Sequence, residues 1–294
     1  MNLGQVIRGR VCMGCVFVLM FLACYGYLYG QENYEIQVYP SETIAPKTLL
    51  MELHSNYTVQ GNTTTENGML PTQHQEHETI ELTQGITDWS EVGFYIFTAE
   101  RNGNGAHWVG DHIRPRVRVP LSWHWPVGVS VSNEIGYASP EFANPTWSWQ
   151  INPIVDKTSG PWYWSINTIM NWGHPVPPPR SDTPAQKTIY YRDVSPGGLT
   201  FSPAATLTYQ PSKHYNFGIE YYGYYGEIGN FVSLHNQQQQ FFPVVNLFVS
   251  SKWEINFGAG WGATASTDHL IVKGILGHYF NWGKPRFSKP ADRF

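Results

Sequence analysis

The sequence has little charge and almost no cysteine. Its 294 residues include 3 cysteines, and Cys12, Cys15 and Cys24 all lie within the first thirty positions. A chain that begins after that region therefore has no disulfide, no thiol nucleophile and no thiolate metal site. Charged residues make up 14% of the sequence, whereas a typical soluble protein has about a quarter. This low charge argues against an ordinary soluble domain.

Long apolar runs and common chemical motifs are also missing. After residue 30 no stretch reaches the roughly 18 apolar residues of a membrane-spanning helix. The formal net charge of −4 gives no indication of a nucleic-acid partner. The sequence contains no nucleophile elbow, phosphate loop or dinucleotide fingerprint. We therefore expect no nucleic acid, no cofactor and no enzyme of these classes.

The first thirty residues have the pattern of an export signal. Arg8 and Arg10 precede an apolar run at residues 11–22, which is too short and too early for a membrane anchor. We predict a signal peptide over residues 1–30, with cleavage after Gly30 and sites near Ala23 or Gly26 as alternatives. Residues 31–46 are then expected to form a loosely ordered periplasmic lead-in.

Aromatic residues are abundant, at 15% of the chain, with 12 Trp, 18 Tyr and 15 Phe. High aromatic content with little charge is typical of a transmembrane β-barrel, in which aromatic rings lie at the two membrane interfaces. It is also typical of a secreted carbohydrate-binding sandwich. Composition alone leaves both classes open.

Residues 78–98 show the local pattern that organises the chain. Ile80 and Leu82 alternate with polar residues, and after a short corner Val92, Phe94 and Ile96 alternate again. Such alternation predicts two antiparallel strands, and runs of about ten residues are long enough to cross a bilayer in a tilted barrel. Similar runs predict strands over 47–59, 78–84, 91–98, 113–121, 127–137, 147–155, 162–170, 199–209, 215–225, 241–249, 253–263 and 270–280.

The connections between these strands alternate in length. Long connections at 60–75, 101–111, 172–197 and 226–238 alternate with short ones at 85–90, 122–126, 156–160, 210–214 and 250–252, while 138–145 and 264–268 are intermediate. Outer-membrane barrels pair short periplasmic turns with longer outer loops. We predict an all-β fold: a monomeric, transmembrane, antiparallel up-and-down β-barrel of about 12 strands over residues 47–280. A periplasmic polar tail at 281–294 follows it.

One face of these strands is polar, and in a membrane barrel that face lines the lumen. We predict eight lumen or constriction residues: Arg114, Arg116, Arg118, Glu52, Glu81, Glu134, Glu220 and Lys273. They could form a paired Arg–Glu network that stiffens the barrel, or a charged constriction that favours anions. Both readings remain open. The tryptophans near strand ends are predicted to form interfacial aromatic girdles, namely Trp89, Trp123, Trp125, Trp147, Trp162 and Trp253.

Metal and catalytic sites are not predicted. His74 and His77, like His107 and His112, lack a recognisable ligand spacing, so no metal is expected. Ser266, Asp268 and His269 are close in sequence at a predicted rim, as in lipid-modifying barrel enzymes, but triad residues normally converge from separate segments.

The motif GITDWSEVG at residues 85–93 resembles one found in bacterial outer-membrane proteins named for the meta-cleavage pathway of phenol degradation. The resemblance is specific over about twenty residues. It implies an outer-membrane barrel that passes aromatic or hydrophobic compounds, and it transfers no catalytic residue.

We therefore predict an outer-membrane channel or uptake porin for small solutes in a Gram-negative bacterium. Its expected partners are the lipid bilayer, a small-molecule solute, the barrel-assembly machinery and periplasmic chaperones. The alternatives are a plugged structural barrel, a lipid-modifying membrane enzyme and a secreted sugar-binding sandwich.

Overall fold

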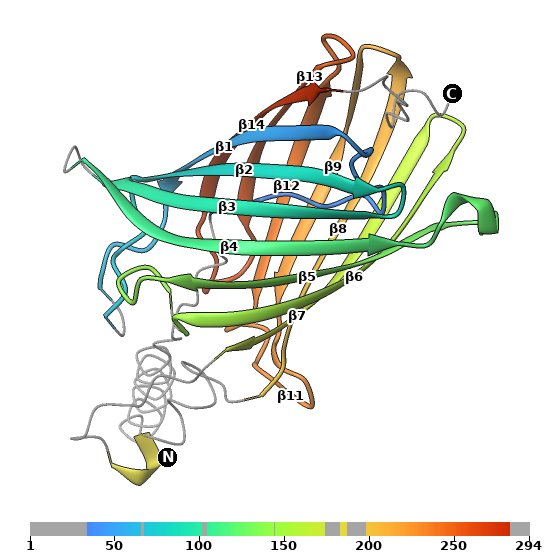
Figure 1. The fold of residues 1–294 in the computed structure, drawn as a ribbon. Coiled ribbons are helices and arrows are strands. Elements are labelled where there is room, and N and C mark those ends of the chain that lie inside the picture. The colour runs from blue at the N-terminus through green and yellow to red at the C-terminus, as the bar shows by residue number, and fades with distance from the viewer. Residues whose placement is uncertain are drawn as a thin grey trace, which may run out of the picture.

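The computed structural model describes residues 34–65, 68–101, 105–143, 145–173, 183–186 and 198–282. Within this part the chain is almost entirely strand, and antiparallel pairing closes the sheet on itself (Figure 1). The predicted signal peptide at 1–30 and the predicted tail beyond Trp282 lie outside the described residues.

Twelve long strands form the wall, in chain order around the barrel, with β14 pairing to β1 and β8 pairing to β9. They are β1 (Thr48–Gln60), β2 (Gln75–Thr87), β3 (Ser90–Arg101), β4 (Ala106–Arg118), β5 (Gly128–Ala138), β6 (Trp147–Ser159), β7 (Trp162–Gly173), β8 (Thr200–Ser212), β9 (Tyr215–Tyr224), β12 (Gln238–Leu247), β13 (Trp253–Gly262) and β14 (Leu270–Asn281). Two short strands, β10 (Gly226–Glu227) and β11 (Asn230–Phe231), lie between β9 and β12, and η1 (Leu121–Trp123) lies between β4 and β5. The predicted twelve-stranded antiparallel barrel is confirmed.

The two ends of the barrel differ. The turn end carries the connections at 88–89, 119–127, 160–161, 213–214 and 248–252, together with the start of β1 and the end of β14. The loop end carries those at 61–74, 102–105, 139–146, 174–199, 225–237 and 263–269. Two of these are shorter than predicted, because β2 begins at Gln75 and β4 at Ala106. The first residues of these two strands are mostly polar, so the alternation of apolar and polar residues that predicts a strand is not visible there.

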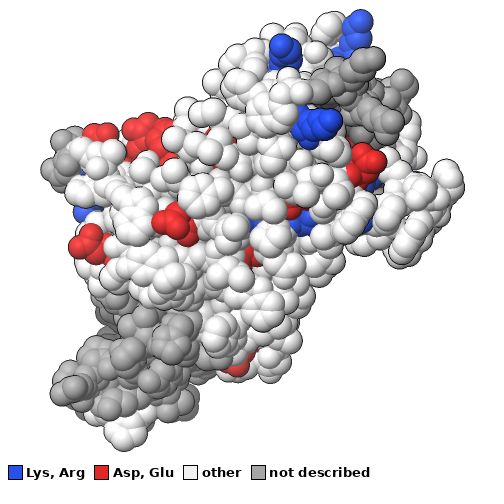
Figure 2. Space-filling view, in the orientation of Figure 1, with Lys and Arg blue, Asp and Glu red and all other residues white. Residues whose placement is uncertain are grey.

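The wall has its apolar side chains outside and its polar side chains inside. On β1, Met51, Leu53 and Tyr57 are 38–41% exposed, whereas Glu52 and His54 are buried. Most of the surface seen in Figure 2 is uncharged. This arrangement is the reverse of a soluble sandwich and matches a barrel solvated by lipid. Separately, the described residues include no helix long and apolar enough to span a membrane.

Prolines interrupt the ladder at four places in the wall, namely Pro115, Pro153, Pro211 and Pro243. Pro115 in β4 and Pro153 in β6 lie inside strands, where a residue without an N–H cannot donate to the neighbouring strand. The β4–β5 and β6–β7 pairings each skip the proline and the residue before it. Thr168 Oγ1 donates to the Pro153 carbonyl at 3.1 Å, so a side chain partly replaces the lost contact.

Candidate functional site: a lumen closed from within

The lumen contains a stretch of the chain itself, residues 34–45, which we call the inner segment. It lies inside the barrel and reaches the turn end, where β1 begins. This segment lies within the predicted lead-in of residues 31–46, and its position differs from the expectation that this region is loosely ordered in the periplasm. Its buried side chains, each at most 9% exposed, are Tyr34, Ile36, Val38, Tyr39, Ser41, Glu42 and Thr43.

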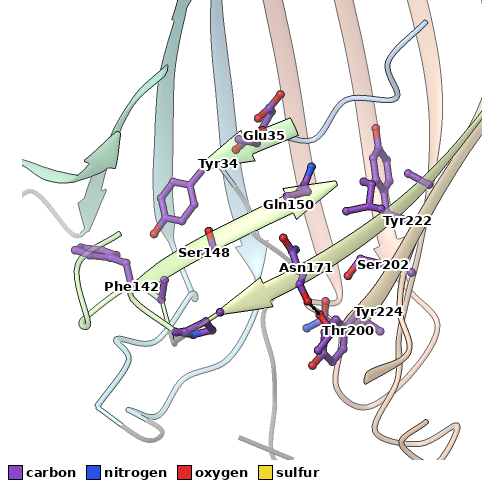
Figure 3. Close-up of a pocket in the computed structure, with 18 of the residues that line it drawn as sticks. Tyr34, Glu35, Phe142, Ser148, Gln150, Asn171, Thr200, Ser202, Tyr222 and Tyr224 are labelled. Carbon is purple, nitrogen blue, oxygen red and sulfur yellow. Dashed lines mark hydrogen bonds between the residues drawn. The ribbon is translucent and has the colours of Figure 1, made fainter. Parts of the chain in front are cut away.

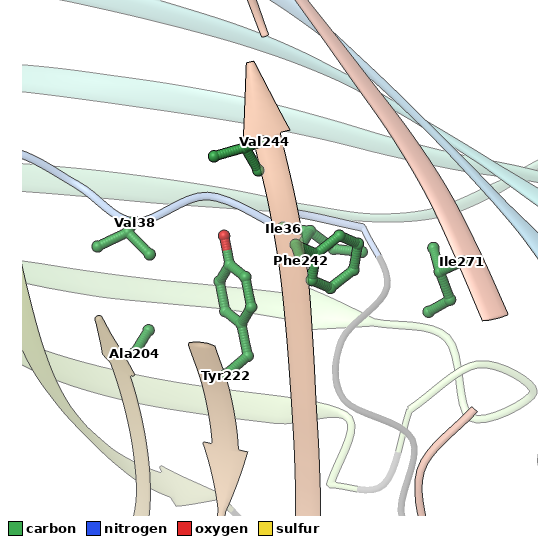
Figure 4. Packing of buried hydrophobic residues seen from close by; sticks show 7 residues of the cluster. All are labelled: Ile36, Val38, Ala204, Tyr222, Phe242, Val244 and Ile271. Carbon is green, nitrogen blue, oxygen red and sulfur yellow. The ribbon is translucent and has the colours of Figure 1, made fainter. Parts of the chain in front are cut away.

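Apolar packing holds the middle of the inner segment. Ile36 and Val38 belong to a buried cluster contributed by β8, β9, β12 and β14 (Figure 4). The wall residues of the cluster are Ala204, Tyr222, Phe242, Val244 and Ile271. Full burial of an aliphatic side chain contributes roughly 1.5–3 kcal/mol. The segment is therefore a packed part of the interior.

The main chain of the inner segment is bound by wall side chains and forms no strand of its own. The Tyr39 N–H donates to Asn167 Oδ1 at 2.9 Å, and the Tyr39 carbonyl accepts from Ser165 Oγ and Asn167 Nδ2. Lys273 Nζ donates to the Ile36 carbonyl at 2.8 Å. Buried main-chain groups need partners, and here β7 and β14 supply them.

A buried aspartate anchors the segment near the turn end. Asp156 of β6 is fully buried and accepts from the Ser41 N–H at 3.0 Å and from Ser41 Oγ at 2.6 Å. Tyr163 also donates to the same carboxylate. Ser41 thus donates two hydrogen bonds to one carboxylate. Hydrogen bonds to a charged acceptor are stronger than those between neutral groups.

The predicted arginines face the lumen and are paired. Arg114 Nη2 lies 2.5 Å from Glu81 Oε1, and Arg116 Nη2 lies 2.5 Å from Glu91 Oε1. The Tyr39 ring lies 4.4 Å from the Arg114 guanidinium carbon, close enough for a cation–π contact.

The same ladder touches the inner segment at two further points. Arg116 Nη1 donates to the Pro40 carbonyl at 3.0 Å, and Arg118 Nη1 lies 3.8 Å from Glu42 Oε1. Of the two readings of these arginines, the geometry favours the paired network, because each guanidinium contacts a carboxylate.

The other predicted lumen residues also point inward. Lys273 Nζ lies 2.5 Å from Glu220 Oε2, and Glu134 is hydrogen-bonded to His112. All eight predicted lumen positions are at most 8% exposed, namely Glu52, Glu81, Arg114, Arg116, Arg118, Glu134, Glu220 and Lys273. Their placement in the lumen is observed, and a role in selecting solutes stays a prediction.

Two cavities flank the inner segment. The loop-side cavity, of about 250 Å³, is lined by aromatic and amide side chains that include Tyr34, Phe142, Gln150 and Tyr222 (Figure 3). Burial, followed by the charges of neighbouring carboxylates, raises the pKa of the Glu35 carboxyl at its edge.

The turn-side cavity, of about 240 Å³, is lined by Glu52, Glu81 and Arg116 among others. Gln37 and Tyr39 line both cavities. The inner segment thus lies between two chambers of similar size. Sequence reasoning missed Tyr34 and Tyr39, although the alternation of Tyr34, Ile36 and Val38 is a strand-like signal of burial.

The motif at residues 85–93 faces the inner segment. A side chain at Gly85 would meet the carbonyl oxygens of Ile44 and Ala45, so the close approach of two backbones requires glycine. Glu91 Oε2 accepts from the Ile44 N–H at 2.6 Å. This short motif therefore shapes the place where the inner segment leaves the lumen.

The six predicted girdle tryptophans lie on the outer surface, each 41–62% exposed. Trp89, Trp123, Trp125, Trp162 and Trp253 are at the turn end, and Trp147 is at the loop end. At the loop end Tyr137 lies between Trp108 and Trp147, with ring centroids 5.7 and 5.4 Å away. Aromatic rings thus occur at both ends, as membrane interfaces favour.

Ser266 and Asp268, which were considered for catalysis, form hydrogen bonds between loops at the rim. Ser266 Oγ donates to the His235 carbonyl at 3.2 Å. Asp268 Oδ1 accepts from Thr72 Oγ1 at 2.7 Å and from the Asn62 N–H. These bonds connect the β13–β14 loop to the loops at 61–74 and 225–237.

A closed antiparallel wall of twelve strands, apolar outside and polar inside, defines a porin-type outer-membrane β-barrel. No protein-family model and no curated protein matches the sequence. Among solved structures, the COG4313 outer-membrane channel from Pseudomonas putida F1 matches with a TM-score of 0.53 and 10% identity, over 84% of this chain and 100% of that chain. The KdgM porin (TM-score 0.50, 7% identity) and the NanC porin (0.50, 6%) each match over 79% of this chain, and over 99% and 98% of their own. At these identities the matches establish the fold.

Proposed function

We propose that the protein is an outer-membrane channel for the uptake of small solutes, with the inner segment as its gate. The observation that carries this proposal is the position of the inner segment between two cavities that share Gln37 and Tyr39. A solute that enters from the loop end reaches the first cavity and passes to the second when the inner segment moves. The channel needs no catalytic group. The lipid bilayer and the solute are its partners, and the barrel-assembly machinery and periplasmic chaperones would deliver it to the membrane.

The solutes we infer are small aromatic or hydrophobic compounds that carry hydroxyl groups. Aromatic side chains on the loop-side cavity offer stacking surfaces, and Gln150 and Asn171 beside them offer hydrogen bonds. The resemblance of residues 85–93 to the phenol meta-cleavage outer-membrane proteins supports the same class. Membership of that family is part of the proposal.

Catechol should bind the loop-side cavity, whereas ribitol, which has hydroxyl groups but no ring, should not. We expect saturable binding of catechol to the detergent-solubilised protein, and about tenfold weaker binding to Phe142→Ala, because that ring lines the cavity. Titration calorimetry measures both affinities.

Phe241→Ala is the matched control, since that ring on β12 faces outward and packs on Tyr221. It should bind catechol like the unchanged protein. Equal binding of catechol and ribitol, or an equal loss in both variants, would rule out an aromatic-selective cavity.

The second candidate function is a plugged structural barrel. It is favoured by one observation, the number of anchors on the inner segment, which include Asp156, Asn167, Lys273 and Glu91. The two candidates differ in whether the inner segment moves while solute passes, and a reversible disulfide lock on that segment separates them.

A further inference from the structure

Two buried carboxylates face each other on the inner side of the wall. Glu52 of β1 and Glu81 of β2 are directly opposite in the antiparallel register and are 3% and 1% exposed. Like charges at opposed positions repel, and burial strengthens the repulsion. The positive charge of Arg114 compensates the Glu81 carboxylate. Glu52 Oε1 accepts a hydrogen bond from Gln37 Nε2 at 3.4 Å, and this neutral amide does not compensate the Glu52 charge.

A buried histidine lies next to this pair. His54 is two residues after Glu52, on the same face of β1, and is fully buried. Neither of its ring nitrogens has a hydrogen-bond partner among the described residues. Its Nε2 lies 3.6 Å from Glu81 Oε2, so the ring points toward the carboxylates. Buried polar groups normally have partners, so both nitrogens of this imidazole are available to a ligand.

We propose that Glu52, His54 and Glu81 bind one divalent first-row transition-metal ion. One ligand atom from each residue lies within 4.8 Å of the other two. Zinc lies about 2.0–2.2 Å from nitrogen and carboxylate ligands, so small side-chain rotations would close the site around an ion. One imidazole with two carboxylates suits Zn²⁺, Fe²⁺ or Mn²⁺, and a divalent ion would neutralise both carboxylates.

The surroundings orient the ligands and leave a path to them. Glu81 Oε1 is held by Arg114 Nη2 and by Thr83 Oγ1, both at 2.5 Å, which directs Oε2 toward His54. Bonds of this kind to a ligating carboxylate tune metal affinity. Glu52 and Glu81 both line the turn-side cavity, through which an ion would arrive.

The site also touches the inner segment. Gln37 contacts Glu52 Oε1, and Tyr39 Oη lies 3.5 Å from Glu81 Oε2. No spacing in the sequence marks this cluster, because Glu81 comes from a different strand than Glu52 and His54. Only the β1–β2 register brings the three together.

Zinc binding tests the site in the full chain after signal removal, purified without a histidine tag. Metal content after dialysis against Zn²⁺ should be one ion per chain, and Zn²⁺ should raise the midpoint of thermal unfolding. His54→Gln and Glu52→Gln should each bind at least about tenfold more weakly. X-ray absorption should show one nitrogen and carboxylate oxygens as ligands.

His77→Gln is the matched control. His77 is also buried, and both its ring nitrogens lack hydrogen-bond partners among the described residues, but it does not belong to the carboxylate cluster. It should keep full zinc binding. Absence of bound zinc, or zinc retained by both His54→Gln and Glu52→Gln, would overturn the site. Heat-modifiable migration on a detergent gel identifies the folded variants to compare.

Discussion

Removal of residues 31–44 should raise the single-channel conductance by about tenfold or more, because a twelve-stranded wall encloses more space than its own side chains fill. The deletion takes away Ile36, Val38 and Tyr39, which occupy the middle of the lumen. It also merges the two cavities that now meet at Gln37 and Tyr39. The twelve strands keep their own ladder, so the barrel itself should persist.

Planar-bilayer recording of the refolded protein measures this change. A shorter deletion, of residues 31–33 only, is the control, because it leaves the inner segment in place and should conduct like the unchanged chain. Heat-modifiable migration on a detergent gel verifies folding of both variants. A folded deletion of 31–44 that conducts no better than the unchanged chain would contradict the assignment of the inner segment as the plug.

Arg114→Leu should have the largest effect on stability. Arg114 is 1% exposed, and its guanidinium contacts Glu81, Glu91 and the Tyr95 hydroxyl. Breaking a buried ion pair by removing one partner costs about 3–5 kcal/mol, because the other charge stays buried and unpaired. We expect a loss of that size in unfolding free energy, measured by urea titration in lipid vesicles.

Two comparisons identify the cause of the loss. Adding Glu81→Gln to Arg114→Leu should restore part of the stability, since it removes the uncompensated charge. Arg118→Leu should cost less, because the Arg118–Glu42 distance is 3.8 Å and both side chains are more exposed. Equal losses in the Arg114 and Arg118 variants, with no rescue by Glu81→Gln, would show that lost packing dominates.

The wall could be predicted from sequence because a strand has a simple period of two. Residues such as Met51, Leu53 and Tyr57 alternate with Glu52, His54 and Asn56. If the apolar face of each strand contacts lipid, the opposite face must line the lumen. In the structure Arg114, Arg116 and Arg118 are buried on the inner side of the wall. The short turns predict that consecutive strands pair as hairpins, and the alternation of loop lengths then predicts the order of the strands around the barrel.

The inner segment could not be predicted in this way. Its burial depends on Asn167, Asp156 and Lys273, which lie more than a hundred residues away in the sequence. Because this stretch contains Pro40 and the polar residues Ser41, Glu42 and Thr43, its sequence predicts a loosely ordered lead-in. The Glu42 carboxylate, for example, lies 3.8 Å from Arg118 Nη1, a residue 76 positions later in the sequence.

The cluster of Glu52, His54 and Glu81 was hidden for a related reason. Metal-ligand motifs are recognised by spacing along one element, whereas this cluster depends on which residue of β2 faces Glu52. A register shift of one residue would turn Glu81 to the lipid face. The role of Gly85 was similarly hidden, since it depends on the carbonyl groups of Ile44 and Ala45.

The most direct test of the gate is a reversible lock on the inner segment. A side-chain carbon placed at Gly128 would lie 3.2 Å from the Ser41 Cβ, close to the roughly 3.5–4.5 Å of a disulfide. It would also overlap with Asp156 Oδ1, so the Asp156 carboxylate must rotate away when the bridge forms. A chain that starts at Gln31 has no cysteine of its own, so Ser41→Cys with Gly128→Cys introduces a single possible bridge. We predict that catechol flux into proteoliposomes falls to background in the oxidised protein and returns when a reductant is added. Equal flux in the oxidised and reduced states would show that solute passes without movement of the inner segment, and absence of flux in both states would identify a plugged structural barrel.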